Sequence, residues 1–236
     1  MTEHRTLDWI PRFDEKSRAY PIRATIGTVI DQPRVWSPPP FVLDQGREGA
    51  CVGFGWTGEL IGSPYPDPYA TVEVGERYAR SLYRAAQVID EWEGEDYEGT
   101  SVLAGAKALK ARGLINEYRW AFSIGEVRDA LITTGPVVVG VPWFDGMYET
   151  DANGIVSIGG DLVGGHCLFV YEYHPAKRLP GDWYGRHRVF RWRNSWGPEY
   201  GLKGSGYVHY DDLAKLLEWG GEACVPVTRS RVRLTA

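Results

Sequence analysis

The chain has 236 residues, of which 43% are hydrophobic and 24% are charged, and its formal net charge is −5. This length can bury the core of one compact domain or of two lobes that share a cleft, and the composition is that of a folded globular protein. The negative charge argues against a nucleic-acid partner, since phosphate binding needs a basic face. We interpret the basic run at residues 186–193 as the solvated face of a strand and a loop.

Cysteine usage and the N-terminus bear on the compartment. Three cysteines without paired spacing favour a reducing compartment over a disulfide framework. The N-terminus carries charges and Pro11 where a secretory signal peptide needs an apolar run. The longest apolar stretch, at residues 137–141, is too short to span a bilayer. We therefore expect a cytoplasmic protein that does not bind membranes; the sequence does not indicate its oligomeric state.

Helix signals dominate the first half of the chain. Residues 1–40 are rich in proline and should form an irregular lead-in with one short strand near residues 25–30. Ser101 and Gly113 are suitable N-cap and C′ residues for a helix between them. Helices are expected at Cys51–Leu60, 74–90, 102–112 and Ile124–Thr133.

Strand patterns replace the helical ones after residue 136. A last helix is expected at residues 213–218, with Asp211 and Asp212 as its cap. A site assembled from the helical half and the β-rich half would lie in the cleft between them. Strands are expected at 137–141, 167–173, Val189–Arg193 and 206–210.

Three side chains supply complementary parts of a nucleophilic site. Cys51 is a thiol at the start of a predicted helix, His166 is an imidazole that opens a predicted strand, and Asn194 is an amide that follows another. A thiolate attacks far better than a thiol, and both the positive end of the helix and a His166 imidazolium would lower the pKa of Cys51. A lone buried cysteine or core histidine is usually structural, but the combination favours catalysis.

Other groups complete the predicted site. Asn194 can accept a hydrogen bond from one imidazole nitrogen and leave the other facing the sulfur. Trp196 could keep water away from that hydrogen bond. The side-chain amide of Gln45 and the backbone N–H of Cys51 could form an oxyanion hole.

The sequence predicts neither a metal site nor a cofactor. The glycine-rich run at residues 201–206 leads into a strand, so we interpret it as a turn and not as a phosphate-binding loop. Cys167 and Cys224 are expected to be core thiols. A Cys-x-x-Cys pair is missing, and four histidines lack partners at ligand spacing: His4, His174, His187 and His209.

Three local motifs resemble those of the papain-like cysteine peptidases. Gln45 stands six residues before Cys51, a Gly-His pair at His166 opens a strand, and Asn194 begins an Asn-Ser-Trp-Gly segment followed by matching Gly and Tyr residues. The resemblance covers about residues 36–210. It implies an α+β fold in which a helical lobe and a β-barrel-like lobe enclose the active site, with a peptide or protein as substrate and no cofactor.

The resemblance also suggests how the chain is divided. One peptidase domain would comprise a lead-in at residues 1–40 that packs on the lobes, a helical lobe at 41–125 with the nucleophile, and a β-rich lobe at 126–236 with the histidine and asparagine. Residues 175–186 are extra sequence, expected as an exposed loop.

The sequence departs from secretory members of the family. Glu48 stands where they have a second cysteine, and Val52 replaces the tryptophan that usually follows the nucleophile. Cys51 comes too early for a long inhibitory prodomain. The chain is therefore similar to cytosolic and prokaryotic members. Either its N-terminal forty residues regulate access to the cleft in a shorter way, or substrate specificity alone restrains the enzyme.

Substrate-binding positions are likewise implied by the resemblance. The glycines of the β-rich lobe fall where the family lines the pocket for the second side chain upstream of the scissile bond, so this pocket should admit bulky or aromatic side chains. The Gly-Thr pair of the helical lobe would supply a backbone edge for an extended peptide. Six residues are assigned to substrate binding: Gly99, Thr100, Gly140, Gly164, Gly165 and Trp196.

These residues together imply a thiol peptidase that works through a thioester. Two alternatives stay open: a transpeptidase or ligase that passes the acyl group to an amine, and a catalytically silent module that holds a peptide in the cleft. Trapping products with an added amine would separate the first alternative from hydrolysis. The complete set of Gln45, Cys51, His166 and Asn194 argues against a silent module and, through Asn194, against other thiol-enzyme folds.

Overall fold

The computed structural model describes residues 6–11, 14–90, 98–180, 187–229, 231 and 233–234. The predicted helices are confirmed, with ends that differ by at most three residues. The 3₁₀ helices are η1 (Glu15–Ala19), η2 (Ile22–Ala24) and η3 (Asp145–Met147). The α-helices are α1 (Cys51–Leu60), α2 (Val72–Ile89), α3 (Val102–Ala111), α4 (Ile124–Thr133) and α5 (Tyr210–Glu218).

Side-chain caps determine where three of these helices begin. Thr71, Ser101 and Ser123 each accept a hydrogen bond from the backbone N–H three residues later, at the start of α2, α3 and α4. Such a cap is worth about 1 kcal/mol. Gly113 follows α3 with φ of +69°, a conformation that favours glycine. By contrast, α1 begins after Ala50 without a side-chain cap.

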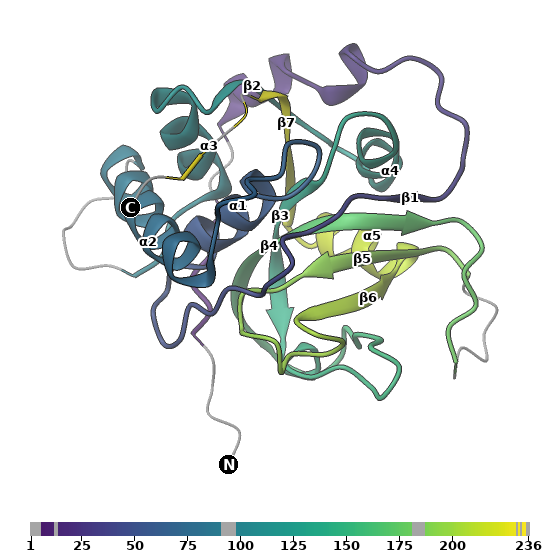
Figure 1. Ribbon diagram of the computed structural model, residues 1–236. Helices are drawn as coiled ribbons and strands as arrows, with labels where there is room; N and C mark the ends of the chain where they lie inside the picture. The colour runs from purple at the N-terminus through teal and green to yellow at the C-terminus, as the bar shows by residue number, and fades with distance from the viewer. Residues whose placement is uncertain are drawn as a thin grey trace.

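Seven strands form one sheet. Six of them follow the order β2-β7-β3-β4-β5-β6, and the seventh, β1, pairs with the C-terminal end of β4. All of these pairings are antiparallel. The strands are β1 (Arg34–Val35), β2 (Ile115–Trp120), β3 (Val137–Phe144), β4 (Leu162–His174), β5 (Val189–Arg193), β6 (Ser205–His209) and β7 (Glu222–Arg229). Helices α1, α2 and α3 gather on one side of the sheet (Figure 1). The predicted α+β class is confirmed.

The sequence predicted β3 to β6 but missed β2 and β7. The segment of β2, Ile-Asn-Glu-Tyr-Arg-Trp, alternates poorly, and β7 contains Pro226 and begins with the buried acid Glu222. Both strands owe their conformation to the sheet, because β7 pairs with β2 on one side and β3 on the other. Tertiary pairing therefore overrides weak local patterns here.

Two local predictions were wrong. Residues 25–30 form no strand; most of them are exposed, and the pairing with β4 is made by β1 instead. Asp211 and Asp212 do not cap α5, which begins at Tyr210, three residues before the predicted start, and has His209 as an N-cap that makes no side-chain capping hydrogen bond. The two aspartates lie in the first turn, where their negative charges still stabilise the helix through its dipole.

The sheet packs on both faces. Alternate residues of β3 and β4 face α1 and α3 on one side, as Val138 and Phe169 do, and α4 and α5 on the other, as Val139 and Val170 do. All ten residues of α1 are buried, so this helix lies at the centre of the molecule. None of the described helices is both long and apolar enough to cross a membrane.

A buried ion pair ties α1 to β7. Arg229 Nη1 lies 2.6 Å from Glu59 Oε1, and the side chains are 3% and 0% exposed. The same nitrogen donates to the backbone oxygen of Glu59 at 3.1 Å. Burying one of these charges alone would cost several kcal/mol, so the pair fixes α1 against the sheet.

Candidate active site

Cys51 is the first residue of α1, and its side chain is fully buried. Close packing fixes the helix that carries it: a Cβ atom on Gly53 would lie 2.2 Å from the carbonyl oxygen of Ala79, and one on Gly55 would lie 3.0 Å from Cys167 Sγ. Backbone groups of Asp8 and Cys167 form hydrogen bonds with the Cys51 thiol. The sulfur therefore lies beside the backbone that follows His166.

His166 lies in β4 and is held by Asn194, the residue that follows β5. The distance between His166 Nε2 and Asn194 Oδ1 is 2.7 Å. The backbone N–H of Ser195 donates to the same atom at 2.7 Å, which identifies it as the amide oxygen. An amide oxygen only accepts, so Nε2 carries the proton. The unprotonated Nδ1 is buried without a hydrogen-bond partner among the described residues and is the nitrogen left to act as a base.

Aromatic rings enclose the imidazole. The centroid of the Trp196 ring lies 4.6 Å from that of His166, and the Trp143 ring lies 4.8 Å away, nearly perpendicular. Burial lowers the pKa of His166 to about 4, although the hydrogen bond with Asn194 acts in the opposite direction. The ring is therefore neutral in this arrangement.

Gln45 belongs to the same polar network. Its side-chain Oε1 accepts a hydrogen bond from Ser195 Oγ at 2.7 Å, and its backbone N–H donates to the Ser195 carbonyl at 2.9 Å. Its Nε2 donates to the carbonyl oxygens of Glu48 at 3.0 Å and Thr6 at 3.3 Å. The donor predicted for an oxyanion is therefore oriented by Ser195, and it contacts a carbonyl oxygen of this chain's own N-terminus.

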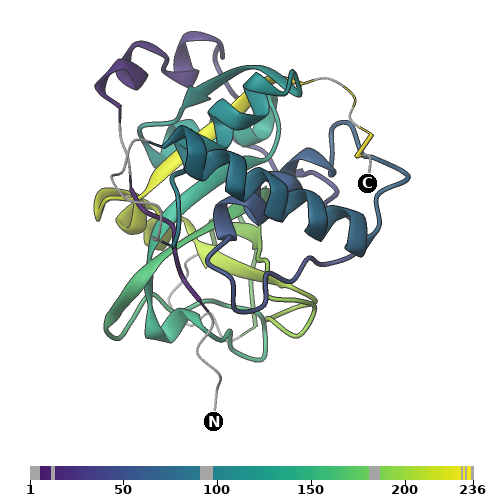
Figure 2. The ribbon, with the colours of Figure 1, turned by 90° about the vertical axis from the view of Figure 1, so that its left-hand side faces the viewer.

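Residues 6–10, the N-terminal segment, run across this site. The backbone N–H of Trp9 donates to Gly165 O at 2.9 Å, and that of Ile10 donates to Thr100 O at 3.0 Å. The N–H of Thr100 donates to Asp8 O at 3.2 Å, so the segment pairs with Thr100 in parallel. Figure 2 shows the segment passing between the helices and the strands of the sheet.

All the residues assigned to substrate binding except Trp196 contact this segment. A Cβ on Gly140 would lie 2.3 Å from the Trp9 ring, and one on Gly165 would lie 2.5 Å from Trp9 O. At Gly164 a Cβ would lie 3.1 Å from Leu7, and at Gly99 it would lie 2.3 Å from Asp8 O. These glycines leave the space that the segment fills.

Burial also determines the protonation of the thiol. Desolvation raises the pKa of Cys51 to about 12, although hydrogen bonds from the backbone of Asp8 and Cys167 act against it. The sequence had led us to expect a lowered pKa from the helix terminus and an imidazolium. In this arrangement burial dominates, and the site holds a neutral thiol and a neutral imidazole.

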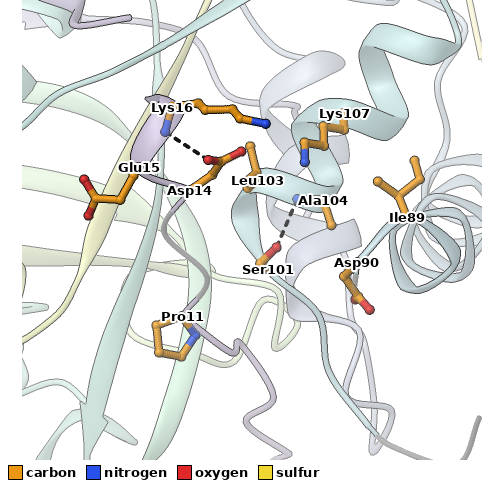
Figure 3. Close-up of a pocket in the computed structure, with 10 residues that line it drawn as sticks. All are labelled: Pro11, Asp14, Glu15, Lys16, Ile89, Asp90, Ser101, Leu103, Ala104 and Lys107. Atoms are coloured by element: carbon orange, nitrogen blue, oxygen red, sulfur yellow. Dashed lines mark hydrogen bonds between the residues drawn. The ribbon is translucent and has the colours of Figure 1, made fainter. Parts of the chain in front are cut away.

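No metal site emerges in the described part of the chain, where no three His, Cys, Asp or Glu side chains come together suitably. A cavity of about 500 Å³ lies where the N-terminal segment leaves the site, between the start of η1 and the facing ends of α2 and α3 (Figure 3). Lys16 and Lys107 line it together with Asp14 and Asp90. None of the four predicted catalytic residues lines this cavity.

Four residues that shape the site had no functional role in the sequence prediction. Trp143 packs on the imidazole, Ser195 orients Gln45, Trp9 fills the space beside Gly140, and Glu222 accepts a hydrogen bond from Trp9. Ser195 lies inside the asparagine motif and could have been noticed there. The other three are brought to the site only by the fold. The sequence prediction of an exposed loop at 175–186 falls partly outside the described residues.

Comparisons with known proteins agree with this architecture. No protein-family model matches the sequence, and no curated protein matches it. Among solved structures, xylellain, a cysteine protease from Xylella fastidiosa, has a TM-score of 0.65 at 17% identity and covers 99% of this chain and 100% of its own. Digestive procathepsin L2 of Tenebrio molitor has a TM-score of 0.57 at 18% identity, and the match covers 94% of this chain and 78% of that one. Digestive procathepsin L3 of the same organism has a TM-score of 0.56 at 15% identity, and the match covers 94% of this chain and 76% of that one. The chain therefore has the fold of papain-like cysteine proteases.

Proposed function

We propose that this protein is a thiol peptidase that cleaves peptide bonds through Cys51 and His166. The observation that carries the proposal is the 2.7 Å hydrogen bond between His166 and Asn194. It leaves Nδ1 of His166 unprotonated and buried without a hydrogen-bond partner among the described residues, and Cys51 supplies a thiol at the start of a helix. This tautomer supports the proposal that His166 is the base, Cys51 the nucleophile and Asn194 the orienting amide.

The proposed reaction uses these residues in two stages, acylation and hydrolysis. Transfer of the thiol proton to His166 Nδ1 gives a thiolate, which adds to the carbonyl carbon of the substrate. Gln45 Nε2 and the backbone N–H of Cys51 donate hydrogen bonds to the oxyanion. Its collapse breaks the C–N bond, and the departing amine takes the proton from His166. Water, deprotonated by His166, then hydrolyses the thioester and restores the thiol.

Catalysis requires that the N-terminal segment leave the site. The segment takes up hydrogen-bonding groups of Gln45, Thr100 and Gly165 that an extended peptide substrate would use. The backbone of Asp8 also forms a hydrogen bond with the Cys51 thiol, so the segment occupies the space beside the proposed nucleophile. The enzyme is therefore latent in this arrangement.

Covalent labelling tests the proposed nucleophile. A peptidyl epoxide directed at thiol peptidases should add once to the full chain, as seen by intact mass, and the adduct should be lost in Cys51→Ala and His166→Ala. Cys224→Ala is the matched control, because Cys224 is also a fully buried free thiol. An adduct that persists in Cys51→Ala, or one that is lost in Cys224→Ala, would contradict the assignment.

A further inference from the structure

Arg80 of α2 holds residues before and after Gln45 in the chain. Its Nε donates to Glu48 Oε2 at 2.9 Å, and its Nη1 donates to Glu76 Oε2 at 3.4 Å. The other carboxylate oxygen of Glu76 accepts a hydrogen bond from the backbone N–H of Asp44 at 3.0 Å. The loop from Asp44 to Glu48 is therefore attached to α2 at both ends.

The same guanidinium contacts α1. The Cζ atom of Arg80 lies 5.3 Å from the centroid of the Phe54 ring. The two helices touch at this level, because a Cβ on Gly53 would lie 2.2 Å from the carbonyl oxygen of Ala79, the residue before Arg80. Arg80 therefore relates the loop to the helix that begins at Cys51.

The attachment reaches the side-chain amide of Gln45. A primary amide nitrogen carries two N–H donors. Those of Gln45 bind the carbonyl oxygen of Glu48 at 3.0 Å and that of Thr6 at 3.3 Å, as measured from Nε2. When the N-terminal segment leaves, the bond to Thr6 is lost and the bond to Glu48 remains. The position of Glu48 then determines where the free N–H points.

We propose that Arg80 is a positioning residue, which keeps Gln45 directed at the oxyanion by holding Glu48 in place. This rests on the proposed peptidase function, in which Gln45 Nε2 binds the oxyanion. The carboxylates of Glu48 and Glu76 both lie against the one guanidinium. Loss of that guanidinium would leave two like charges close together and would push the loop away from α2.

The ion pair should matter for position more than for stability. The side chains of Arg80 and Glu48 are each 33% exposed. Pairs that solvent reaches in this way add little to the stability of a whole fold. The proposal therefore predicts a local effect on the loop and on turnover, in a chain that still folds.

The first arm of the test needs no catalysis and uses the full-length chain. Amide hydrogen exchange of Asp44 and Glu48 is measured by NMR in Arg80→Met. Both amides should exchange at least about fivefold faster than in the parent chain, because the loop has lost its attachment. Arg84→Met is the matched control: Arg84 is an exposed arginine one turn further along α2, and both rates should stay unchanged. Unchanged rates in Arg80→Met would overturn the proposal.

The second arm measures hydrolysis of a fluorogenic peptide by the full-length Trp9→Ala chain, which lacks the indole that anchors the N-terminal segment. Adding Arg80→Met should lower kcat at least about fivefold, with KM nearly unchanged; this is less than the roughly hundred- to thousandfold loss typical of a missing oxyanion donor. The melting temperature should fall by no more than about 4 °C. Adding Arg84→Met instead should change neither kcat nor KM.

A double-mutant cycle distinguishes positioning from a merely structural role. If Arg80 acts through Gln45, Arg80→Met should lower kcat less than about twofold in a chain that already carries Gln45→Ala. A loss of the same size with and without the Gln45 side chain, or a change confined to KM, would overturn the proposal.

The two arms separate this proposal from the function on which it rests. Hydrolysis with a kcat that Arg80→Met does not lower rejects the positioning role and leaves the peptidase intact. Faster exchange of the two amides in a chain that hydrolyses no peptide supports the attachment of the loop by Arg80 and rejects the peptidase.

Discussion

The side-chain nitrogen of Gln45 lies 3.3 Å from the carbonyl oxygen of Thr6, so the oxyanion donor of the proposed site contacts the protein's own N-terminal segment. Three residues further on, the Trp9 indole lies deep in a pocket beside Gly140 and Gly165. The same short segment thus contacts the nucleophile, the oxyanion donor and the substrate pocket. The N-terminal segment, which lies outside the catalytic motifs, therefore bears on access to the proposed site.

Trp9→Ala should release the segment. Replacing a buried tryptophan by alanine typically costs about 3–5 kcal/mol of stabilising free energy. Here most of that loss should weaken the docking of the N-terminal segment. Labelling of Cys51 by the peptidyl epoxide should therefore speed up at least about tenfold at pH 7.5. The exposed aromatic Tyr20, replaced by alanine, is the control and should leave the labelling rate unchanged. Equal rates for Trp9→Ala and the parent chain would show that the segment does not restrain the site.

Asp8→Asn should act in the opposite direction. Burial of the Asp8 carboxyl, with a further effect of Glu98, raises its pKa to about 6, and its Oδ2 is buried without a hydrogen-bond partner among the described residues. At pH 7.5 docking must therefore bury a charge, and the asparagine variant avoids this. Labelling of Asp8→Asn should be roughly three- to tenfold slower than that of the parent. A faster rate would mean that the carboxylate stabilises docking.

Docking of the segment should also depend on pH. A carboxyl whose pKa is raised by docking binds its proton more tightly in the docked state, so docking is strongest below the ordinary pKa near 4 and weakens as the pH rises through about 6. The Trp9 indole N–H resonance in an NMR titration should accordingly lose its docked position between pH 4 and 7. A smaller change in Asp8→Asn is expected, and loss of docking on acidification would contradict the sign.

Ser195→Ala should weaken catalysis without removing a catalytic group. Ser195 Oγ donates to Gln45 Oε1 and so orients the amide whose nitrogen is proposed to bind the oxyanion. Gln45→Ala should lower kcat about a hundred- to a thousandfold, and Ser195→Ala should lower it less, with KM nearly unchanged in both. These values are to be measured in the Trp9→Ala chain. An effect of Ser195→Ala on KM alone would point to substrate binding rather than to positioning.

Glu59→Gln should destabilise the fold by about 3–5 kcal/mol, because it leaves the Arg229 guanidinium buried beside α1 without its partner charge. Urea unfolding followed by far-UV circular dichroism measures this loss. The double variant Glu59→Gln with Arg229→Met should recover part of it, since the uncompensated charge is then absent. A loss within about 0.5 kcal/mol would show that the pair is dispensable.

Local signals accounted for much of the fold. Ser101 caps the start of α3, and Gly113 follows its end with a positive φ. The alternation of apolar and basic residues in Val189–Arg193 predicts β5. The strands β2 and β7 were missed because their residues become strand-like only through pairing with each other and with β3. Local pattern carries no information about such partners.

The site, like the fold, has residues that local motifs predict and contacts that only the three-dimensional structure reveals. Cys51, His166, Asn194 and Gln45 stand in motifs that could be recognised along the chain, and their catalytic roles remain predictions. Nothing in the sequence around Trp9 or Glu222 indicates that residues 213 positions apart form a buried hydrogen bond. The position of the N-terminal segment in the site, and the burial that raises the pKa of Cys51, follow only from the three-dimensional arrangement.

The most direct test of the peptidase assignment is hydrolysis of a fluorogenic peptide by the full-length Trp9→Ala chain, compared with the same chain carrying Cys51→Ala. Hydrolysis by the first and at least about a thousandfold less by the second is expected, because no other described group replaces the nucleophile. Equal hydrolysis by both chains, or none by a folded Trp9→Ala chain, would contradict the account.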